Sequence, residues 1–170
     1  MGFLPETRRL KSHEISLARS VFQGTIDYDS VIVSDSLGIG NCPYTYYLDN
    51  PGPFTGGNYY IYMGEIAYPD LTSKKLMVHD NDEVRNTFIH EMTHVWQGEH
   101  SFFNMVFEHS VVLQMCGKVT GDDPYDYDPG QDWDDYNVEQ QAKIVEAWFR
   151  EGGSSEHDYY DYITENIRKG

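Results

Sequence analysis

Cysteine is scarce in this chain of 170 residues, which contains only Cys42 and Cys116. Two cysteines are too few for a disulfide-dense scaffold, and they lack the paired spacing of a thiolate zinc site, although the sequence allows one bridge. Long apolar runs are also missing. The most apolar segment, residues 101–117, is interrupted by polar residues and therefore predicts a buried helix, not a membrane span. The amino terminus lacks the apolar core of a secretory signal, so we expect no export by the general secretory route.

Basic residues are few, since 12 Lys and Arg face 28 Asp and Glu and give a net charge of -16. A charge of this sign repels phosphate backbones and anionic membrane surfaces. We therefore expect no nucleic-acid partner and no membrane partner. An acidic surface attracts a divalent metal, a basic peptide substrate or a basic inhibitory partner, although an ordinary solvated surface explains the charge equally well.

The length and the 39% content of hydrophobic residues predict one domain, residues 1–170, with a sizeable core. Periodicity and turn residues predict an α+β fold in which a small mixed sheet precedes a helix-dominated half. The expected helices are residues 7–22, 81–97, 101–117, 138–150 and 156–168. The expected strands are residues 26–34, 44–48, 59–63 and 76–78. Residues 118–137 are rich in Asp, Pro, Gly and aromatics and therefore predict a loop. A calcium site in this loop is disfavoured, because Asp126 and Asp128 do not continue into the Gly and terminal Glu of an EF-hand.

The segment His90-Glu91-Met92-Thr93-His94 is the strongest functional signal in the sequence. Two residues four apart on a helix lie on one face, so both imidazoles can reach one metal ion. A glutamate directly after the first histidine is typical of zinc metallopeptidases, in which it serves as the general base. We therefore predict that His90 and His94 bind Zn²⁺ and that Glu91 accepts the proton of the attacking water. We expect no other cofactor.

A catalytic zinc site has three protein ligands and an open position, so a third ligand is needed. His100 lies ten residues after His90, as in the extended metzincin motif, but that motif requires Gly where this chain has Gln97. Glu139, on a later predicted helix, would give the gluzincin set of two His and one Glu. Alternatively, Glu139 is an exposed helical glutamate paired with Lys143. The spacing alone leaves these alternatives open.

Two segments, HEMTHVWQ (residues 90–97) and YNVEQQAKIVEAWF (residues 136–149), resemble the paired signatures of a known family. The family comprises the zincin metallopeptidases attached to type VI secretion spikes, namely the VgrG C-terminal peptidase and VgrG-related families. The resemblance implies a zincin-like fold, Glu139 as the third zinc ligand and Glu91 as the general base. It also implies an antibacterial effector that cleaves peptide bonds in the periplasm of a target cell. The implied partners are a peptide or protein substrate, a secretion spike component and an immunity protein.

Other features leave further alternatives open. Tyr136 and His157 are candidates to stabilise the oxyanion, and residues 59–63 would bind an extended substrate if they formed an edge strand. A zinc-dependent peptidoglycan amidase would share the same site and differ only in its pocket. A non-catalytic binding module with a structural zinc would also carry the two histidines, with its fourth coordination position closed.

Overall fold

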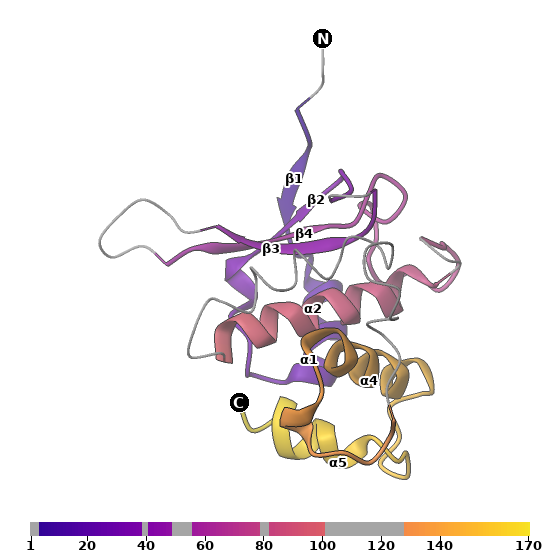
Figure 1. Ribbon diagram of the computed structural model, residues 1–170. Coiled ribbons are helices and arrows are strands. Elements are labelled where there is room, and N and C mark those ends of the chain that lie inside the picture. Colours follow the sequence, from indigo (N-terminus) through magenta and orange to yellow (C-terminus); the bar gives the residue numbers. More distant parts are fainter. Residues whose placement is uncertain (1–3, 39–40, 49–55, 79–81, 101–127) are drawn as a thin grey trace.

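The computed structural model describes residues 4–38, 41–48, 56–78, 82–100 and 128–170. In this part of the chain, a four-stranded sheet covers one side of a group of helices (Figure 1). The strands are β1 (Thr7–Arg9), β2 (Val31–Ser34), β3 (Tyr44–Leu48) and β4 (Asn58–Tyr62). The helices are α1 (Ser12–Phe22), α2 (Val84–His100), α4 (Val138–Arg150) and α5 (Tyr160–Tyr162), which continues as the π-helix Ile163–Ile167. The predicted α+β class, with a small mixed sheet before the helix of the two histidines, is confirmed.

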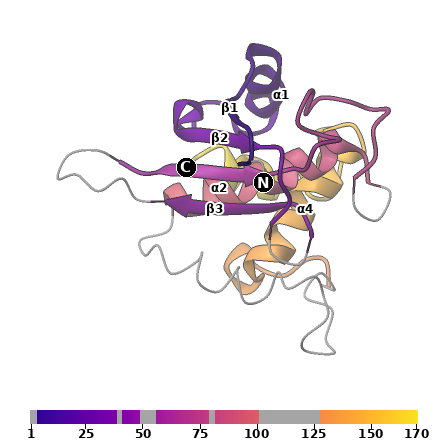
Figure 2. The ribbon, with the colours of Figure 1, turned by 90° about the horizontal axis from the view of Figure 1, so that it is seen from above.

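The strand order of the sheet is β1-β2-β4-β3, with β2 and β4 parallel and the other two pairs antiparallel. Of the two alternatives for residues 59–63, an edge strand or an ordinary core strand, the edge strand is wrong, because β4 is hydrogen-bonded on both sides. The edge strand next to β4 is β3, which lies along one side of the sheet in the view from above (Figure 2). Strand β3 also contacts α2, the helix that carries the two histidines, so the edge of the sheet lies next to this helix.

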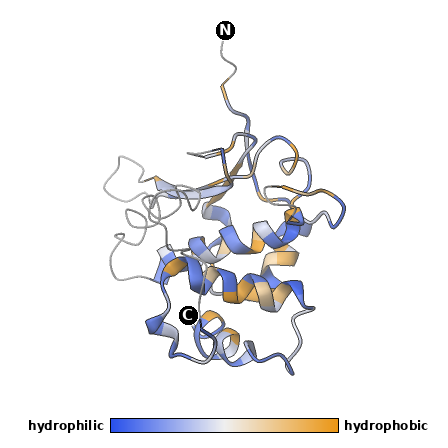
Figure 3. Ribbon diagram, turned by 45° about the vertical axis from the view of Figure 1, so that its right-hand side comes forward, coloured by the Kyte–Doolittle hydropathy of each residue, from blue (hydrophilic) through white to orange (hydrophobic). Residues whose placement is uncertain are grey.

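The core lies between the sheet and the helices. Alternate residues of β2 and β4 point inward, and Val31, Val33 and Ile61 are fully buried. One face of α2 is apolar and belongs to the same core, and all four of its residues are inaccessible to solvent: Val84, Phe88, Met92 and Val95. Each such side chain contributes about 1.5–3 kcal/mol of hydrophobic stabilisation. Figure 3 shows hydrophobic residues recurring along the helices beneath the sheet. This packing fixes the orientation of α2 and thus the direction of its opposite face.

The first predicted helix is too long at its start. Residues 7–9 form β1, which pairs with β2 so that Arg8 lies opposite Val33. The helix begins after Lys11, whose backbone N–H donates to the Glu14 carboxylate at 2.7 Å, and Glu14 also binds Arg8. The pairing of Arg8 with the sheet is a tertiary interaction without a local sequence signal, and for this reason the periodicity misplaced the boundary.

The bounds of α2 also differ from the prediction. The helix begins at Val84, because Met77 forms an isolated bridge with Glu83 and keeps the preceding backbone extended. The predicted strand 76–78 is reduced to this bridge. At its other end α2 continues through the buried Gly98 to His100. The strand predicted at 26–34 is limited to β2, since Tyr28–Ser30 forms a 3-10 turn.

The predicted helix 101–117 and most of the predicted loop 118–137 lie outside the described residues. The described end of that loop contains the 3-10 turn Trp133–Asp135, followed by α4 at the predicted bounds. Cys42 is disulfide-bonded, and the chain's other cysteine, Cys116, lies outside the described residues. No helix of the described part is long and apolar enough to cross a membrane.

Candidate metal centre

Helices α2 and α4 pack side by side and bring three metal-binding side chains together (Figure 1). His90 and His94 lie one turn apart on α2, and their ring centroids are 5.0 Å apart. Glu139 lies in the first turn of α4. His90 Nε2 is 3.3 Å from Glu139 Oε2, and His94 Nε2 is 3.5 Å from Glu139 Oε1. All three residues are buried, and one possible ligand atom from each lies within 4.8 Å of the other two.

The start of α4 fixes the position of Glu139. Asn137 is the N-cap, and its side chain accepts the Gln140 N–H at 2.9 Å, while the Gln140 side chain accepts the Asn137 N–H at 2.9 Å. This capping box ends the preceding turn and starts the helix at Val138. Glu139 has no exposed surface, and Lys143 forms ion pairs with Glu146 and Asp82. The alternative of an exposed glutamate paired with Lys143 is therefore wrong.

Each histidine also has a hydrogen-bond partner at its other ring nitrogen. His90 Nδ1 is 3.0 Å from Glu146 Oε2, and His94 Nδ1 is 2.8 Å from Gln97 Oε1. The Gln97 amide donates in turn to the Val138 carbonyl at 2.9 Å, which connects α2 to the start of α4. Such partners orient a ligating imidazole and select the tautomer that leaves Nε2 free for a metal.

Neither of these two partners was predicted from the sequence. Gln97 lies three residues after His94 on the same helix, and this spacing is a signal that could have identified it. Glu146 follows Glu139 by seven residues, which places both on one face of α4. Both signals are weak alone, because many helical glutamates share these spacings.

The charges of the cluster compensate one another. Burial lowers the pKa of His90, but its hydrogen bonds to Glu139 and Glu146 outweigh this effect and raise the pKa to about 10. Burial raises the pKa of Glu139 and Glu146, yet His94 and His90 hold the pKa of Glu139 well below its usual range, and His90 and Lys143 hold that of Glu146 at about 2. The metal-free cluster thus combines ionised carboxylates with protonated imidazole. A metal ion that binds here displaces protons from the imidazoles.

Glu91 lies beside the cluster and faces the sheet. Its Oε2 accepts a hydrogen bond from the Thr45 hydroxyl on β3 at 2.7 Å, and only 3% of the residue is exposed. Burial raises the pKa of Glu91, while His94, His90 and the Thr45 hydroxyl act in the opposite direction. Glu91 is not among the three clustered residues, as a general base that is not a ligand requires.

The donor set and its spacing fit zinc. Zinc binds imidazole nitrogen and carboxylate oxygen, usually in a tetrahedron with ligands at about 2.0–2.1 Å, so two ligands of one ion lie about 3.3–3.4 Å apart. The distances from Glu139 to His90 and His94, 3.3 and 3.5 Å, agree with this value. The chemistry and the proximity of the three donors therefore fit a zinc ion, although each imidazole faces a different oxygen of Glu139.

The other candidates lie elsewhere. His100 is ten residues further along the unbroken α2, about 15 Å from His90 along the helix axis, and stacks on Trp96. The Tyr136 hydroxyl donates to the Asp128 carbonyl at 3.0 Å. His157 Nε2 is 3.1 Å from Glu151. These contacts do not place any of the three in the cluster.

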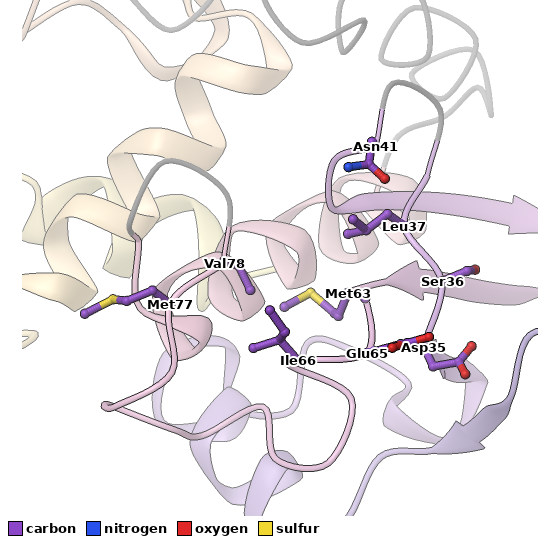
Figure 4. A pocket seen from close by; sticks show the side chains of 10 residues that line it. Asp35, Ser36, Leu37, Asn41, Met63, Glu65, Ile66, Met77 and Val78 are labelled. Carbon is purple, nitrogen blue, oxygen red and sulfur yellow. The ribbon is translucent and has the colours of Figure 1, made fainter.

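A pocket of about 530 Å³ opens near the start of β3. Figure 4 shows Leu37, Met63, Ile66 and Val78 converging on it. Met63 directly follows β4, whose last residue pairs with the first residue of β3. The pocket therefore lies at the end of the edge strand that carries Thr45.

Together the fold and the site define an α+β domain with a buried His-x-x-x-His and Glu cluster of the zincin type. No family model matches the chain. The type VI secretion system spike protein VgrG2b of Pseudomonas aeruginosa strain PAO1 is 31% identical over 175 aligned positions, which cover 96% of this chain. The chain spans only 15% of the length of that relative.

A solved structure shows the same relationship in three dimensions. The effector domain of Pseudomonas aeruginosa VgrG2b matches with a TM-score of 0.56 and 30% identity, over 95% of this chain and 83% of that domain. The chain therefore belongs to the family of the VgrG2b effector domain.

Proposed function

We propose that this chain is a zinc-dependent peptidase domain in which His90, His94 and Glu139 bind the ion and Glu91 is the general base. The observation that carries the proposal is the buried cluster, in which one oxygen of Glu139 lies 3.3 Å from His90 Nε2 and the other lies 3.5 Å from His94 Nε2. Glu91 supports it, because a buried carboxylate beside such a cluster has no structural ion-pair partner among the described residues.

The chemistry divides among the residues as follows. A bound zinc ion would polarise the scissile carbonyl and lower the pKa of a coordinated water. Glu91 accepts the proton of the attacking water and returns it to the leaving amine. Glu146 and Gln97 hold the imidazoles in the orientation that directs Nε2 into the site. Burial of the cluster excludes bulk water and strengthens each of these interactions.

A substrate would bind along β3. Among the described strands, β3 ends the sheet, so it can accept an extended peptide by backbone pairing. Thr45 of β3 contacts Glu91, so a peptide on this edge lies next to the general base. The pocket at the start of β3, lined by Leu37, Met63, Ile66 and Val78, is then available to an apolar part of a substrate side chain.

The family relationship supports delivery by a type VI secretion spike, since the relative is a spike protein and the solved structure is described as its effector domain. We propose that the domain acts in the periplasm of a target cell and that an immunity protein protects the producer. The disulfide at Cys42 favours this compartment, because disulfides persist in the periplasm and are rare in the cytosol.

The direct test uses zinc-loaded protein and an unstructured protein substrate, with cleavage products identified by mass spectrometry. The Glu91→Gln variant should retain one zinc per chain and lose activity by about 10²- to 10⁴-fold, because it can bind water but cannot accept a proton. The matched control is Glu156→Gln, which changes an exposed glutamate. Undiminished cleavage by Glu91→Gln would remove Glu91 from its role. Zinc binding without any cleavage by the unmodified chain would favour a non-catalytic module.

The compartment is tested separately. The chain is expressed in a Gram-negative bacterium with and without a periplasmic export signal, each in unmodified and Glu91→Gln form. We expect growth arrest only for the exported, unmodified chain. Arrest by the cytosolic form alone would contradict the periplasmic site of action, and arrest by exported Glu91→Gln would contradict a peptidase mechanism. Cleavage of cell-wall peptides but not of proteins would replace the peptidase with an amidase.

A further inference from the structure

Thr45 connects the edge strand to the proposed general base. Its hydroxyl oxygen lies 2.7 Å from Glu91 Oε2 and 3.2 Å from the Glu91 backbone oxygen. A hydroxyl has one proton to donate, and the shorter distance is to the carboxylate. A hydrogen bond from a hydroxyl to an ionised carboxylate is short and about twice as strong as one between neutral groups. Thr45 is 1% exposed, so water does not compete for this bond.

Both partners belong to rigid elements. Thr45 is paired with Ile61 of β4, and β4 is held on its other side by β2. Glu91 lies in the middle of α2, between residues that are packed in the core. The Thr45 hydroxyl therefore occupies a fixed point above the helix. It can fix the orientation of the Glu91 carboxylate, which could otherwise rotate about three side-chain bonds.

We propose that Thr45 is a positioning residue that holds the Glu91 carboxylate in the orientation for proton transfer. The inference rests on the proposed peptidase function and deepens it. Thr45 engages Oε2, and no described residue is hydrogen-bonded to Oε1, which is left for the water and the leaving amine. A general base must lie within hydrogen-bond reach of the proton that it accepts. A displacement of about 1 Å can reduce the rate of such a step by about 10²-fold.

A purely structural role for Thr45 makes different predictions. If the hydroxyl only anchored the sheet to the backbone of α2, its loss would lower stability and metal content together. If it positions Glu91, its loss lowers kcat while the ligands remain in place, because His90, His94 and Glu139 do not contact Thr45 through any described hydrogen bond.

The experiment compares Thr45→Val with Thr45→Ser. Valine has the shape and the strand preference of threonine but cannot donate, whereas serine keeps the hydroxyl. We expect Thr45→Val to bind one zinc per chain and to lose about 10- to 100-fold in kcat, with KM within about 3-fold of the unmodified chain. Thr45→Ser should restore kcat to within about 3-fold of the unmodified chain.

The matched control is Thr25→Val. The Thr25 hydroxyl lies 2.6 Å from the Phe22 carbonyl oxygen and 3.0 Å from that of Ile167, so its removal deletes a threonine hydrogen bond remote from the cluster. This variant should keep the kcat of the unmodified chain. A loss of kcat in Thr25→Val equal to that in Thr45→Val would overturn the proposal, because the effect would then not be specific to Glu91.

A structural readout does not depend on activity. In crystals of the metal-free protein, Glu91 should adopt one rotamer in the unmodified chain and in Thr45→Ser, and a different one or several in Thr45→Val. An unchanged Glu91 carboxylate in Thr45→Val, an unchanged kcat, or a kcat loss that Thr45→Ser fails to rescue would each overturn the proposal. If the unmodified chain cleaves no peptide, the peptidase function fails and the inference fails with it. If the unmodified chain is active and Thr45→Val equally so, only the inference fails.

Discussion

The described part of the chain contains two groups of three side chains, each combining histidine with carboxylate, that could hold a metal ion. The two groups differ in which other residues contact their ligand atoms. The cluster of His90, His94 and Glu139 is buried throughout. The cluster of His13, Glu14 and Asp70 has its ligand atoms equally close together, within 4.8 Å, but His13 is exposed and Asp70 only half-buried. The number and proximity of the ligand atoms therefore do not distinguish the two clusters.

The contacts of Glu14 explain the difference. Arg8 binds its two oxygens at 2.7 and 2.8 Å, and the backbone N–H groups of Lys11 and Leu71 donate to the same oxygens at 2.7 and 3.1 Å. A carboxylate accepts about four hydrogen bonds, so Glu14 is saturated by groups that a cation would repel or have to displace. Glu139 instead faces two imidazoles, which a metal can use as ligands. The first cluster is therefore the candidate metal site, whereas the contacts of Glu14 assign the second cluster to the stability of the fold.

The sharpest test of this comparison is the loss of one histidine from each cluster. His94→Ala should reduce zinc affinity on the order of 10³-fold, because it removes one of three protein ligands. His13→Ala, the matched control, should leave zinc affinity unchanged. Competition with a chromogenic chelator measures both. Equal losses in the two variants would show that zinc does not discriminate between the clusters.

Removal of Arg8 tests the structural role of the second cluster. Arg8→Ala leaves the buried Glu14 without its cation and should lower the free energy of unfolding by about 3 kcal/mol. Zinc affinity should not change. Urea denaturation measures the effect, and Lys169→Ala is the control, since its exposed pair with Glu165 contributes at most about 1 kcal/mol. An Arg8→Ala protein as stable as the control would argue against saturation of Glu14.

Glu146, the hydrogen-bond partner of His90, should contribute less to zinc affinity than a zinc ligand does. Glu146→Ala removes the carboxylate that orients His90 and should lower zinc affinity by about 10- to 100-fold. Glu151→Ala, at the C-cap of the same helix, is the control, because it removes the carboxylate paired with His157, outside the cluster. Calorimetric titration with zinc compares the two. The role of Glu146 would be refuted by equal affinities.

The smallest effect on zinc affinity is expected for a substitution of Gln97. Its neutral side chain orients His94 and connects it to the carbonyl of Val138, so Gln97→Ala should lower zinc affinity by about 10-fold, the lower end of the range for such partners. Gln97→Glu should restore most of the affinity, because a carboxylate oxygen can accept the same His94 N–H. The same titration measures both variants, and a failure of Gln97→Glu to restore affinity would place the role of Gln97 in its bond to Val138.

The sequence predicted those parts of the molecule that depend on local signals. The bounds of α4, Val138–Arg150, were predicted from its apolar period, and the structure has the same bounds. Spacing alone paired His90 with His94. Strand β1 was missed, because Thr7–Arg9 has no β pattern and is ordered by its pairing with β2.

The remainder of the site depends on contacts between distant parts of the chain. Thr45 and Glu91 are 46 residues apart, and His90 and Glu146 are 56 apart, so no window of the sequence contains either pair. Glu139 was identified through the family resemblance, since spacing left His100 as an alternative. Local sequence patterns thus predict the candidate ligands on one helix. The groups that orient these ligands come close to them only when the helices and the sheet pack.

The most direct test of the central claim is anomalous diffraction from crystals soaked in zinc. We predict one peak per chain within about 2.0–2.2 Å of His90 Nε2, His94 Nε2 and a Glu139 oxygen, with a position open to solvent for a water. A peak beside His13 and Asp70, or none between α2 and α4 at saturating zinc, would contradict the account.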